Sequence, residues 1–522
     1  MGADPPSMPP ASATPVAAGE LNSAVVRILD GLPAVGLAVG VICGGALTWF
    51  HGYGVADIES GAPVDEDTVF RIASVTKTMT AIAVMQLCEL GLVDLDAPAS
   101  DYLRAYRLIP AKARFRPATL RHLLTHTAGV RAARTAADLF RPVMGWGVPA
   151  GRPVPSLAEY YRDGLHIDVE PGTRWAYSNH GFATVGQIVE DVSGLPFGRY
   201  LAERIFGPLG MDSTDLTRSA RVRARVATGY QMRSAGPVPV RDYENIPAGG
   251  GSVYSTTRDM TRYAAALLGG GTGAHGQVLR PQTVARMFQP HYQPDPRIPG
   301  MGLGFFRDEI AGHRTVGHDG IWTGFHAALL LAPDDGTGVV ALANTGPFNP
   351  VAAPGPVVHA VLRSLLGLPD DAVRTDLPPQ PQVWRELCGW YTLGPGVLTD
   401  PQPRMLLAAG AEVAVHRGQL VIRGQLPIPA VRRGLRLHPD GDDPYAFRIQ
   451  LPPVGSGTSR IVFSRGPGGD VTALHLDTYP MTLHKRPAVR NPRPWINGAL
   501  AAGATALAVR HRARARHGAR KG

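Results

Sequence analysis

Lysine is scarce in this chain of 522 residues. Only four are present, at positions 77, 112, 485 and 521, beside 48 arginines. Arginine stays protonated in proteins and cannot act as a base, whereas a lysine in a suitable environment can. Each lysine is therefore an exception to the general use of arginine. The residues around it in the sequence indicate whether it takes part in catalysis.

Cysteine is rare, and several common motifs are missing. Cys43, Cys88 and Cys388 lie far apart in apolar contexts, which excludes a disulfide framework and predicts buried free thiols. His122 and His126 have the spacing of a zinc helix but lack the glutamate of H-E-x-x-H. Neither GxxxxGKS/T nor G-x-S-x-G occurs, which disfavours nucleotide-phosphate chemistry and the α/β-hydrolase fold. We expect no metal and no cofactor.

Acidic residues are absent from the C-terminal end. Ten basic residues and no acidic ones follow Asp477, so the formal charge of +10 belongs to this segment and residues 1–477 are neutral in sum. A neutral body gives no indication of a basic groove for nucleic acid on it. The tail has the charge for weak contact with an anionic membrane surface, but a solvated, disordered end is the better interpretation.

The first 50 residues contain no targeting signal and one misleading apolar run. Residues 1–20 have neither a basic segment nor an apolar core, so we expect them to be disordered and the protein to be cytoplasmic. Residues 31–50 are uncharged and long enough to span a bilayer. The pair Gly44-Gly45 divides them into two strand-like halves, which favours a buried β-hairpin.

Strand and helix patterns predict two domains of mixed α/β (α+β) class. Within residues 21–368, strand signals lie at both ends and helical periodicity between them, which predicts an antiparallel sheet flanked by helices, with a helical subdomain. Residues 369–384 are rich in proline and aspartate and resemble a linker. Short strands and turns fill 385–488 and predict a small antiparallel β-barrel-like domain. Residues 489–522 form the basic tail.

One lysine stands three residues after a serine, in the run Ser74-Val75-Thr76-Lys77. Positions three apart share a helix face, so this hydroxyl and this amine can meet. A partly buried amine can lose its proton near neutral pH and activate a serine. A helix-capping serine followed by a surface lysine is the ordinary alternative. The scarcity of lysine favours a nucleophile and its base.

A second stretch, WAYSNHGF, offers two partners at the start of a helical pattern. Tyr177 can act as a phenolate or pass a proton. Asn179 can orient an amine or hold a substrate amide. Taken alone, the two residues are better explained as a buried aromatic residue and a helix cap.

A third stretch, VGHDGIW, places His318 and Gly320 at a strand start. Gly320 would let a substrate carbonyl approach the backbone closely. The strand-edge N–H there, at Ile321, could form an oxyanion hole with the N–H of Ser74. Alone, His318 is better explained as a histidine in a turn.

The ordered motifs S-x-x-K, Y-x-N and H-x-G are together much more specific than any one of them. They resemble those of the serine β-lactamase and penicillin-recognising superfamily, in particular the branch with class C β-lactamases, D-aminopeptidases and related esterases. LRHLLTHTAGV and PAGGGSVYSTTRDMTRY also look like this family, and the resemblance covers about residues 30–368. CGWYTLG, at 388–394, looks like the opening strand of the small lipocalin-like barrels often appended to such enzymes.

The resemblance implies that Ser74 is acylated, that Lys77 and Tyr177 handle its proton, and that Asn179 supports Lys77 and the substrate. β-Lactamases and D,D-peptidases of the superfamily usually have a lysine where this chain has His318, and that lysine helps bind a carboxylate. A mostly neutral histidine does this less well. We therefore expect a serine hydrolase that acts through an acyl-enzyme on a small ester or amide. A β-lactamase or D,D-peptidase, or a non-catalytic penicillin-binding-like sensor, are the alternatives.

Overall fold

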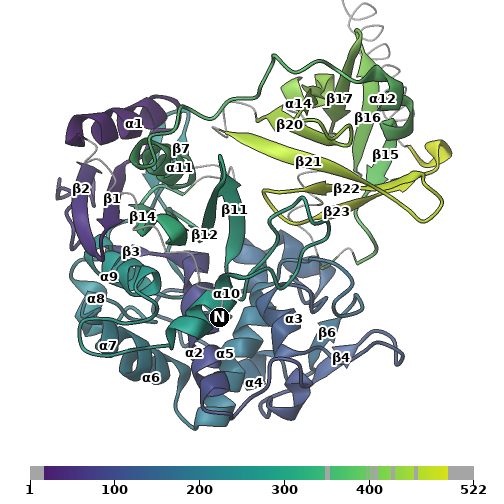
Figure 1. Ribbon diagram of the computed structural model, residues 1–522. Coiled ribbons are helices and arrows are strands. Elements are labelled where there is room, and N and C mark those ends of the chain that lie inside the picture. The colour runs from purple at the N-terminus through teal and green to yellow at the C-terminus, as the bar shows by residue number, and fades with distance from the viewer. Residues whose placement is uncertain are drawn as a thin grey trace, which may run out of the picture.

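The computed structural model describes residues 17–346, 353–396, 398–399, 404, 410–424, 429–451 and 457–491. Figure 1 shows a larger body in which helices surround a sheet and, from residue 389 onward, a smaller body built mainly of strands. The basic tail beyond residue 491, with the membrane contact considered for it, lies outside the described residues.

A six-stranded antiparallel sheet forms the centre of the larger body. Its strands follow the order β11-β12-β13-β14-β1-β2, so strands from the two ends of this region are neighbours, as the sequence predicts. Gly44 and Gly45, both with positive φ, join β1 to β2, so the apolar run at 31–50 contains a hairpin. The strands are β1 Gly36–Cys43, β2 Ala46–Gly54, β11 Phe306–Ile310, β12 His313–Trp322, β13 Phe325–Ala332 and β14 Thr337–Ala343.

The two faces of this sheet belong to two separate cores. One face packs against α1 (Ala18–Gly31) and α11 (Pro354–Leu365), and the other against α2 (Thr76–Glu89) and α9 (Thr257–Leu268). β13 and β14 are buried along their whole length, because helices cover them on both sides. No helix in the described part of the chain is long and apolar enough to cross a membrane.

Short helices and strands fill the region between β2 and β11, in agreement with the predicted helical subdomain. The longest helix in this region is α5, with 15 residues, and it directly follows the WAYS segment. The elements are β3 Val69–Arg71, β4 Leu108–Pro110, α3 Leu120–Leu124, β5 Gly147–Pro149, α4 Leu157–Tyr160, β6 Leu165–Ile167, α5 Asn179–Ser193, α6 Phe197–Leu201, α7 Gly207–Leu209, α8 Ala220–Arg223, β7 Tyr230–Arg233, β8 Gly236–Pro239, β9 Tyr243–Asn245, β10 Tyr254–Thr256 and α10 Pro281–Phe288.

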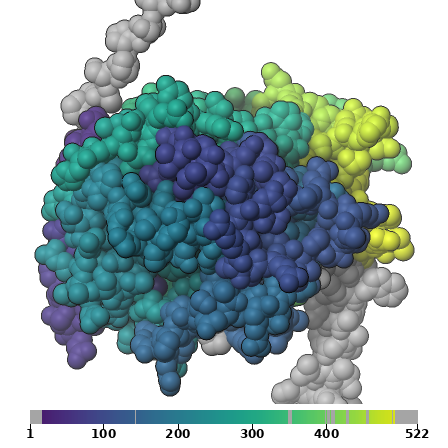
Figure 2. Space-filling model, turned by 90° about the horizontal axis from the view of Figure 1, so that it is seen from below, coloured from purple at the N-terminus to yellow at the C-terminus, as the bar shows by residue number. Residues whose placement is uncertain are grey.

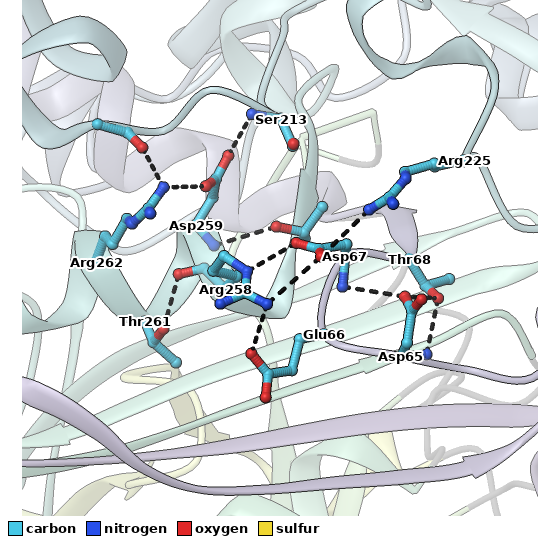
Figure 3. A network of polar contacts seen from close by, with 12 residues as sticks. Asp65, Glu66, Asp67, Thr68, Ser213, Arg225, Arg258, Asp259, Thr261 and Arg262 are labelled. Atoms are coloured by element: carbon cyan, nitrogen blue, oxygen red, sulfur yellow. Dashed lines mark hydrogen bonds and ion pairs between the residues drawn. The ribbon is translucent and has the colours of Figure 1, made fainter.

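Charged side chains fix the start of α9 against the segment that leads into β3. Arg258 forms ion pairs with Asp67 at 2.8 Å and with Glu66 at 2.9 Å, and Arg225 reaches Asp67 at 3.3 Å. Figure 3 shows Arg258 between the two acidic side chains. Each of these partly exposed pairs contributes only about 0–1 kcal/mol. Together they anchor the chain just before β3, the strand that leads to Ser74.

The smaller body is a nine-stranded antiparallel sheet in the order β18-β17-β16-β15-β23-β22-β21-β20-β19. Its two end strands, β18 and β19, are separated in sequence by Leu437 alone, so the sheet curls back on itself and is nearly closed. This confirms the predicted barrel-like architecture. The strands are β15 Gly389–Thr392, β16 Ala411–His416, β17 Gln419–Arg423, β18 Leu435–Arg436, β19 His438–Pro439, β20 Ala446–Gln450, β21 Thr458–Arg465, β22 Val471–Leu476 and β23 Thr482–Arg486; the described helices are α12 Pro381–Leu387 and α14 Pro429–Arg433.

Four expectations need correction. Residues 18–20 are helical, because they begin α1, whose Leu21 and Val25 are buried against α11. The predicted linker overlaps α12, which begins at Pro381 and buries Leu387 in the core of the small body. The predicted tail includes a 3-10 turn at Ala488–Arg490. The three cysteines are free, as expected, but half-buried rather than buried.

The two bodies are in contact through polar and aromatic side chains. Arg297 pairs with Asp443 of the small body at 2.7 Å and donates to the carbonyl of Phe463 at 2.9 Å. Arg174 donates to the carbonyl of Pro395 at 2.7 Å. Figure 2 shows the yellow end of the described chain lying against one flank of the larger body. The small body therefore borders the region in which the motifs meet.

Candidate active site

Ser74 lies in the tight turn that joins β3 to α2. The turn is a 3-10 segment, Ala73–Val75, and Ala73 has a φ of 45°, which is uncommon for a residue other than glycine. Ala73 and Val75 are buried, whereas Ser74 is half-buried. The strained turn thus leaves the Ser74 hydroxyl accessible in a segment that is otherwise buried.

Lys77 lies one helical turn after Ser74 and is fully buried, with 0% of its surface exposed. Its Nζ is 2.9 Å from Ser74 Oγ, 2.6 Å from Asn179 Oδ1 and 2.5 Å from the carbonyl oxygen of Gly250. Burial holds the pKa of the amine well below its ordinary value. A neutral amine has two protons and one lone pair. The amine can donate one proton to Asn179 Oδ1 and the other to the Gly250 carbonyl oxygen, because both of these oxygens are acceptors. Its lone pair can then point at the Ser74 hydroxyl.

Asn179 and Gly250 provide the other two contacts of this amine. Ser178 caps α5 by accepting a hydrogen bond from the Gly181 N–H at 3.1 Å, so Asn179 is the first residue of the helix. Gly250 packs so closely that an added Cβ would lie 2.9 Å from the Asn179 carbonyl oxygen. The sequence reasoning did not predict Gly250 as a partner of Lys77. The triple-glycine run around it was the available signal.

Tyr177 lies over the same amine and beside Ser74. Lys77 Nζ is 4.8 Å from the centre of its ring, and the ring of His126 lies 4.2 Å away on centroids. Desolvation raises the pKa of Tyr177 far above its ordinary value, and a hydrogen bond with Ser74 lowers it by less. Tyr177 is therefore a neutral phenol that can donate or relay a proton, and the phenolate role considered from the sequence is disfavoured.

His318 lies on β12 with only 4% of its surface exposed. Its Nδ1 donates to the carbonyl of Asp319 at 2.6 Å, so its Nε2 carries the lone pair. Burial, and to a lesser degree Lys77, lower the pKa of His318 to about 3. The ring is uncharged at neutral pH. It cannot provide the positive charge that binds a carboxylate.

Gly320 brings β12 against the Ser74 turn. An added Cβ there would lie 2.1 Å from the Ile72 carbonyl oxygen and 3.1 Å from the Ser74 nitrogen. From the sequence, we expected Gly320 to make room for a substrate carbonyl. This expectation needs correction, because the backbone of the protein itself occupies that space. β11 pairs with β12 only up to Gly317, which leaves the outer edge of 318–322 free of β11. The Ile321 backbone lies on this free segment, next to Ser74.

An aromatic wall, formed by Trp175, Phe306 and Tyr479, borders the site. The Tyr479 ring stacks on Trp175 with centroids 5.6 Å apart and meets Phe306 at the same distance, edge to face. Phe306 in turn contacts the His318 ring at 5.0 Å. Tyr479 belongs to the turn between β22 and β23 of the small body. No local pattern in the sequence predicted a role for Tyr479, because only the packing of the two bodies brings it to the site.

The two histidines with zinc-like spacing have other roles. His122 Nδ1 accepts a hydrogen bond from the Thr119 N–H at 3.2 Å and completes the cap of α3. His126 packs beneath Tyr177. Within the described ranges, no three His, Cys, Asp or Glu side chains are grouped so that they could hold a metal ion.

The chain matches known proteins over the region that builds this site. The family model described as Beta-lactamase matches residues 25–362. A β-lactamase from Yersinia enterocolitica is 26% identical over 365 residues, which cover 63% of this chain and 87% of that protein. Esterase EstB from Burkholderia gladioli is 29% identical over 360 residues, which cover 63% of this chain and 90% of that protein.

A solved structure extends the likeness to the small body. The octameric penicillin-binding protein homologue from Pyrococcus abyssi has a TM-score of 0.57 and 21% identity, and the match covers 90% of this chain and 99% of that one. At this identity the likeness shows the fold alone. It extends beyond the stretch that the family model matches.

Proposed function

The chain belongs to the Beta-lactamase family, and from that premise we propose that it is a serine hydrolase that cleaves a small ester or amide through an acyl-enzyme. The observation that carries the proposal is the contact of 2.9 Å between the hydroxyl of Ser74 and the buried amine of Lys77. An amine with a lowered pKa beside a serine is the arrangement that nucleophilic catalysis requires.

The proposed reaction begins when neutral Lys77 accepts the proton of Ser74. The Ser74 oxygen attacks the substrate carbonyl, and the N–H groups of Ser74 and Ile321 stabilise the oxyanion. The intermediate collapses, and the leaving group departs with a proton relayed through Tyr177. Water then attacks the acyl-Ser74 ester, and Lys77 takes up its proton. The bond from the acyl carbon to Ser74 Oγ breaks, Lys77 returns the proton to Ser74 Oγ, and the acid is released.

The uncharged state of His318 supports an ester or amide substrate that lacks an obligatory carboxylate. A buried imidazole with a pKa of about 3 provides no cation for a carboxylate at neutral pH. β-Lactams and terminal D-alanine peptides carry such a carboxylate. The second candidate, a β-lactamase or D,D-peptidase, is favoured by the family itself, and hydrolysis of a chromogenic cephalosporin at a rate that rivals esters would establish it.

The direct test compares wild type with Ser74→Ala on a panel of short-chain p-nitrophenyl esters and anilides. We expect turnover by wild type, none by Ser74→Ala, and covalent labelling of wild type alone by a fluorophosphonate probe. Full labelling of Ser74→Ala would remove Ser74 from the mechanism. A stoichiometric burst without steady-state turnover would indicate the sensor function instead.

A further inference from the structure

His126 occupies a backbone position that favours glycine. It follows the end of α3, where the N–H of Thr127 donates to the carbonyl of His122 at 2.8 Å. The N–H of His126 itself donates to the carbonyl of Leu123 at 3.3 Å. This pair of bonds is a Schellman turn, whose left-handed residue is usually glycine. His126 adopts that conformation with a φ of 56°, which is unfavourable for a residue with a side chain. The turn alone therefore does not explain the histidine.

The segment that carries Tyr177 takes its backbone hydrogen bonds from His126. Residues 175–178 belong to neither a helix nor a strand. The N–H of Ala176 donates to the carbonyl oxygen of His126 at 2.7 Å. The N–H of Ser178 donates to Nδ1 of the His126 ring at 3.2 Å. One residue thus holds the peptide N–H groups on both sides of Tyr177.

The His126 ring also packs against the Tyr177 ring. The two centroids are 4.2 Å apart and the planes are inclined by 31°, which is a tilted stack. The ring of Phe182 lies 5.0 Å away, and only 2% of the His126 surface is exposed. The stacked phenol lies over the amine of Lys77, whose Nζ is 4.8 Å from the ring centre. Two backbone hydrogen bonds and one ring contact from His126 therefore fix the place of Tyr177 in the site.

The His126 ring cannot itself take the proton of Ser74. Its Nδ1 accepts the Ser178 N–H, so Nε2 carries the proton of the neutral ring. Burial holds the pKa of His126 well below its ordinary value. Nε2 has no hydrogen-bond partner among the described residues, a cost that an apolar ring would avoid. What histidine adds to an apolar ring is the Nδ1 acceptor for Ser178, and what it adds to glycine is that acceptor and the stack.

We propose that His126 is a positioning residue for Tyr177, which it holds so that the phenol can pass a proton to the leaving group. The inference rests on the proposed function and adds a residue to it. His126 supplies no proton and acts only through Tyr177. Its effect on rate should therefore depend on the Tyr177 hydroxyl and on how much the leaving group needs a proton.

The test uses two esters that differ at one ring substituent. p-Nitrophenyl acetate releases a weakly basic phenolate that departs without a proton, and p-methoxyphenyl acetate releases a more basic one. The enzymes are wild type, His126→Gly, His126→Asn, Tyr177→Phe, both double variants, and the control His122→Asn. Glycine removes the ring and the acceptor but suits the left-handed turn. Asparagine tolerates the turn and keeps an acceptor. His122 caps the same helix without contacting Tyr177.

His126→Gly should lower kcat/KM for p-methoxyphenyl acetate by about tenfold, a part of the usual contribution of a general acid, and for p-nitrophenyl acetate by less than about threefold. In the Tyr177→Phe background the same change should cost less than about twofold on either ester. His126→Asn should lose less than His126→Gly, and His122→Asn should keep both rates. Thermal unfolding checks each fold, and if His126→Gly does not fold, the asparagine variants carry the comparison. Equal losses on the two esters, or an undiminished loss in the Tyr177→Phe background, would overturn the inference.

Crystal structures of wild type, His126→Gly, His126→Asn and His122→Asn separate this inference from the proposed function. The Tyr177 ring should leave its wild-type place in the His126 variants and keep it in His122→Asn. A displaced ring, with no hydrolysis of any ester by wild type, would support the placement of Tyr177 by His126 and refute the hydrolase. Hydrolysis by wild type, with the ring unmoved in the His126 variants, would refute the positioning role and leave the hydrolase supported.

Discussion

The Nζ atom of Lys77 lies 2.9 Å from the Oγ of Ser74, on a helix face with no exposed surface at the lysine. A lysine that only carried charge would extend into solvent. This one is also held by Asn179 and Gly250, and its pKa is lowered by burial. The pair therefore has the geometry and the proton affinity of a nucleophile and its base.

Replacement of Lys77 by arginine should nearly abolish turnover. Arginine keeps the charge but cannot accept a proton near neutral pH, so kcat/KM should fall by at least about a hundredfold, the usual contribution of a general base. The measurement is steady-state hydrolysis of the best ester, with thermal unfolding as a check on the fold. The matched control is Lys112→Arg on an exposed residue, which should retain full activity. An active Lys77→Arg enzyme would refute the proposed base.

The fall of kcat/KM at acid pH should result from protonation of Lys77. Because burial lowers its pKa, the amine is neutral well below the ordinary lysine range, and kcat/KM should fall with one ionisation on the acid side. His318 titrates near pH 3 and the pKa of Tyr177 is raised, so neither should add a limb between pH 5 and 9. Profiles of wild type and His318→Gln test this. An acid limb that moves in His318→Gln would assign it to the histidine.

The sequence predicted the parts of the site that lie within continuous motifs. Ser74 and Lys77 share a helix face, and the hydrogen bond from Lys77 to Asn179 matches the support expected for the amine. Gly250 and Tyr479 could not be predicted in the same way. Their contribution depends on a close backbone approach and on the packing of two bodies, and neither leaves a periodic pattern in the chain.

Gly320→Ala should destabilise the protein and reduce activity together. An added Cβ would meet the Ile72 carbonyl oxygen at 2.1 Å, and this backbone leads directly to Ser74. Overpacking of this kind costs about 1–3 kcal/mol, and the displaced turn should also lower kcat. Thermal unfolding and ester hydrolysis measure the two effects. Gly19→Ala, in α1 with nothing within 4 Å of the new methyl, is the control. It should leave activity unchanged and should not lower stability, because alanine favours a helix more than glycine does. Wild-type activity in a stable Gly320→Ala protein would show that the close packing of β12 is not required.

Arg297→Ala should loosen the small body from the larger one. Its guanidinium forms ion pairs with Asp295 and Asp443, both at 2.7 Å, and donates to the Phe463 carbonyl. Hydrogen bonds to charged groups contribute about 1.5–3 kcal/mol when partly buried, so scanning calorimetry should show an earlier transition. Arg162→Ala removes an exposed pair with Asp163 and should change little. If Arg297→Ala unfolds like wild type, this contact does not hold the two bodies together.

Asp319→Asn should stabilise the protein at high pH and not at low pH. The folded-state pKa of about 6 exceeds the ordinary value of 3.8, so between these values the folded state binds more protons than the unfolded state, and stability falls as the pH rises. Above about pH 6 the full cost is present, and asparagine avoids it. Because the side chain is exposed, the gain should stay at or below about 1 kcal/mol.

The melting temperature of Asp319→Asn should therefore exceed that of wild type at pH 8, and the difference should disappear at pH 4. Asp163→Asn is the control for the same substitution at an exposed carboxylate. A lower melting temperature of Asp319→Asn at pH 8 would instead show that the carboxylate supports the fold.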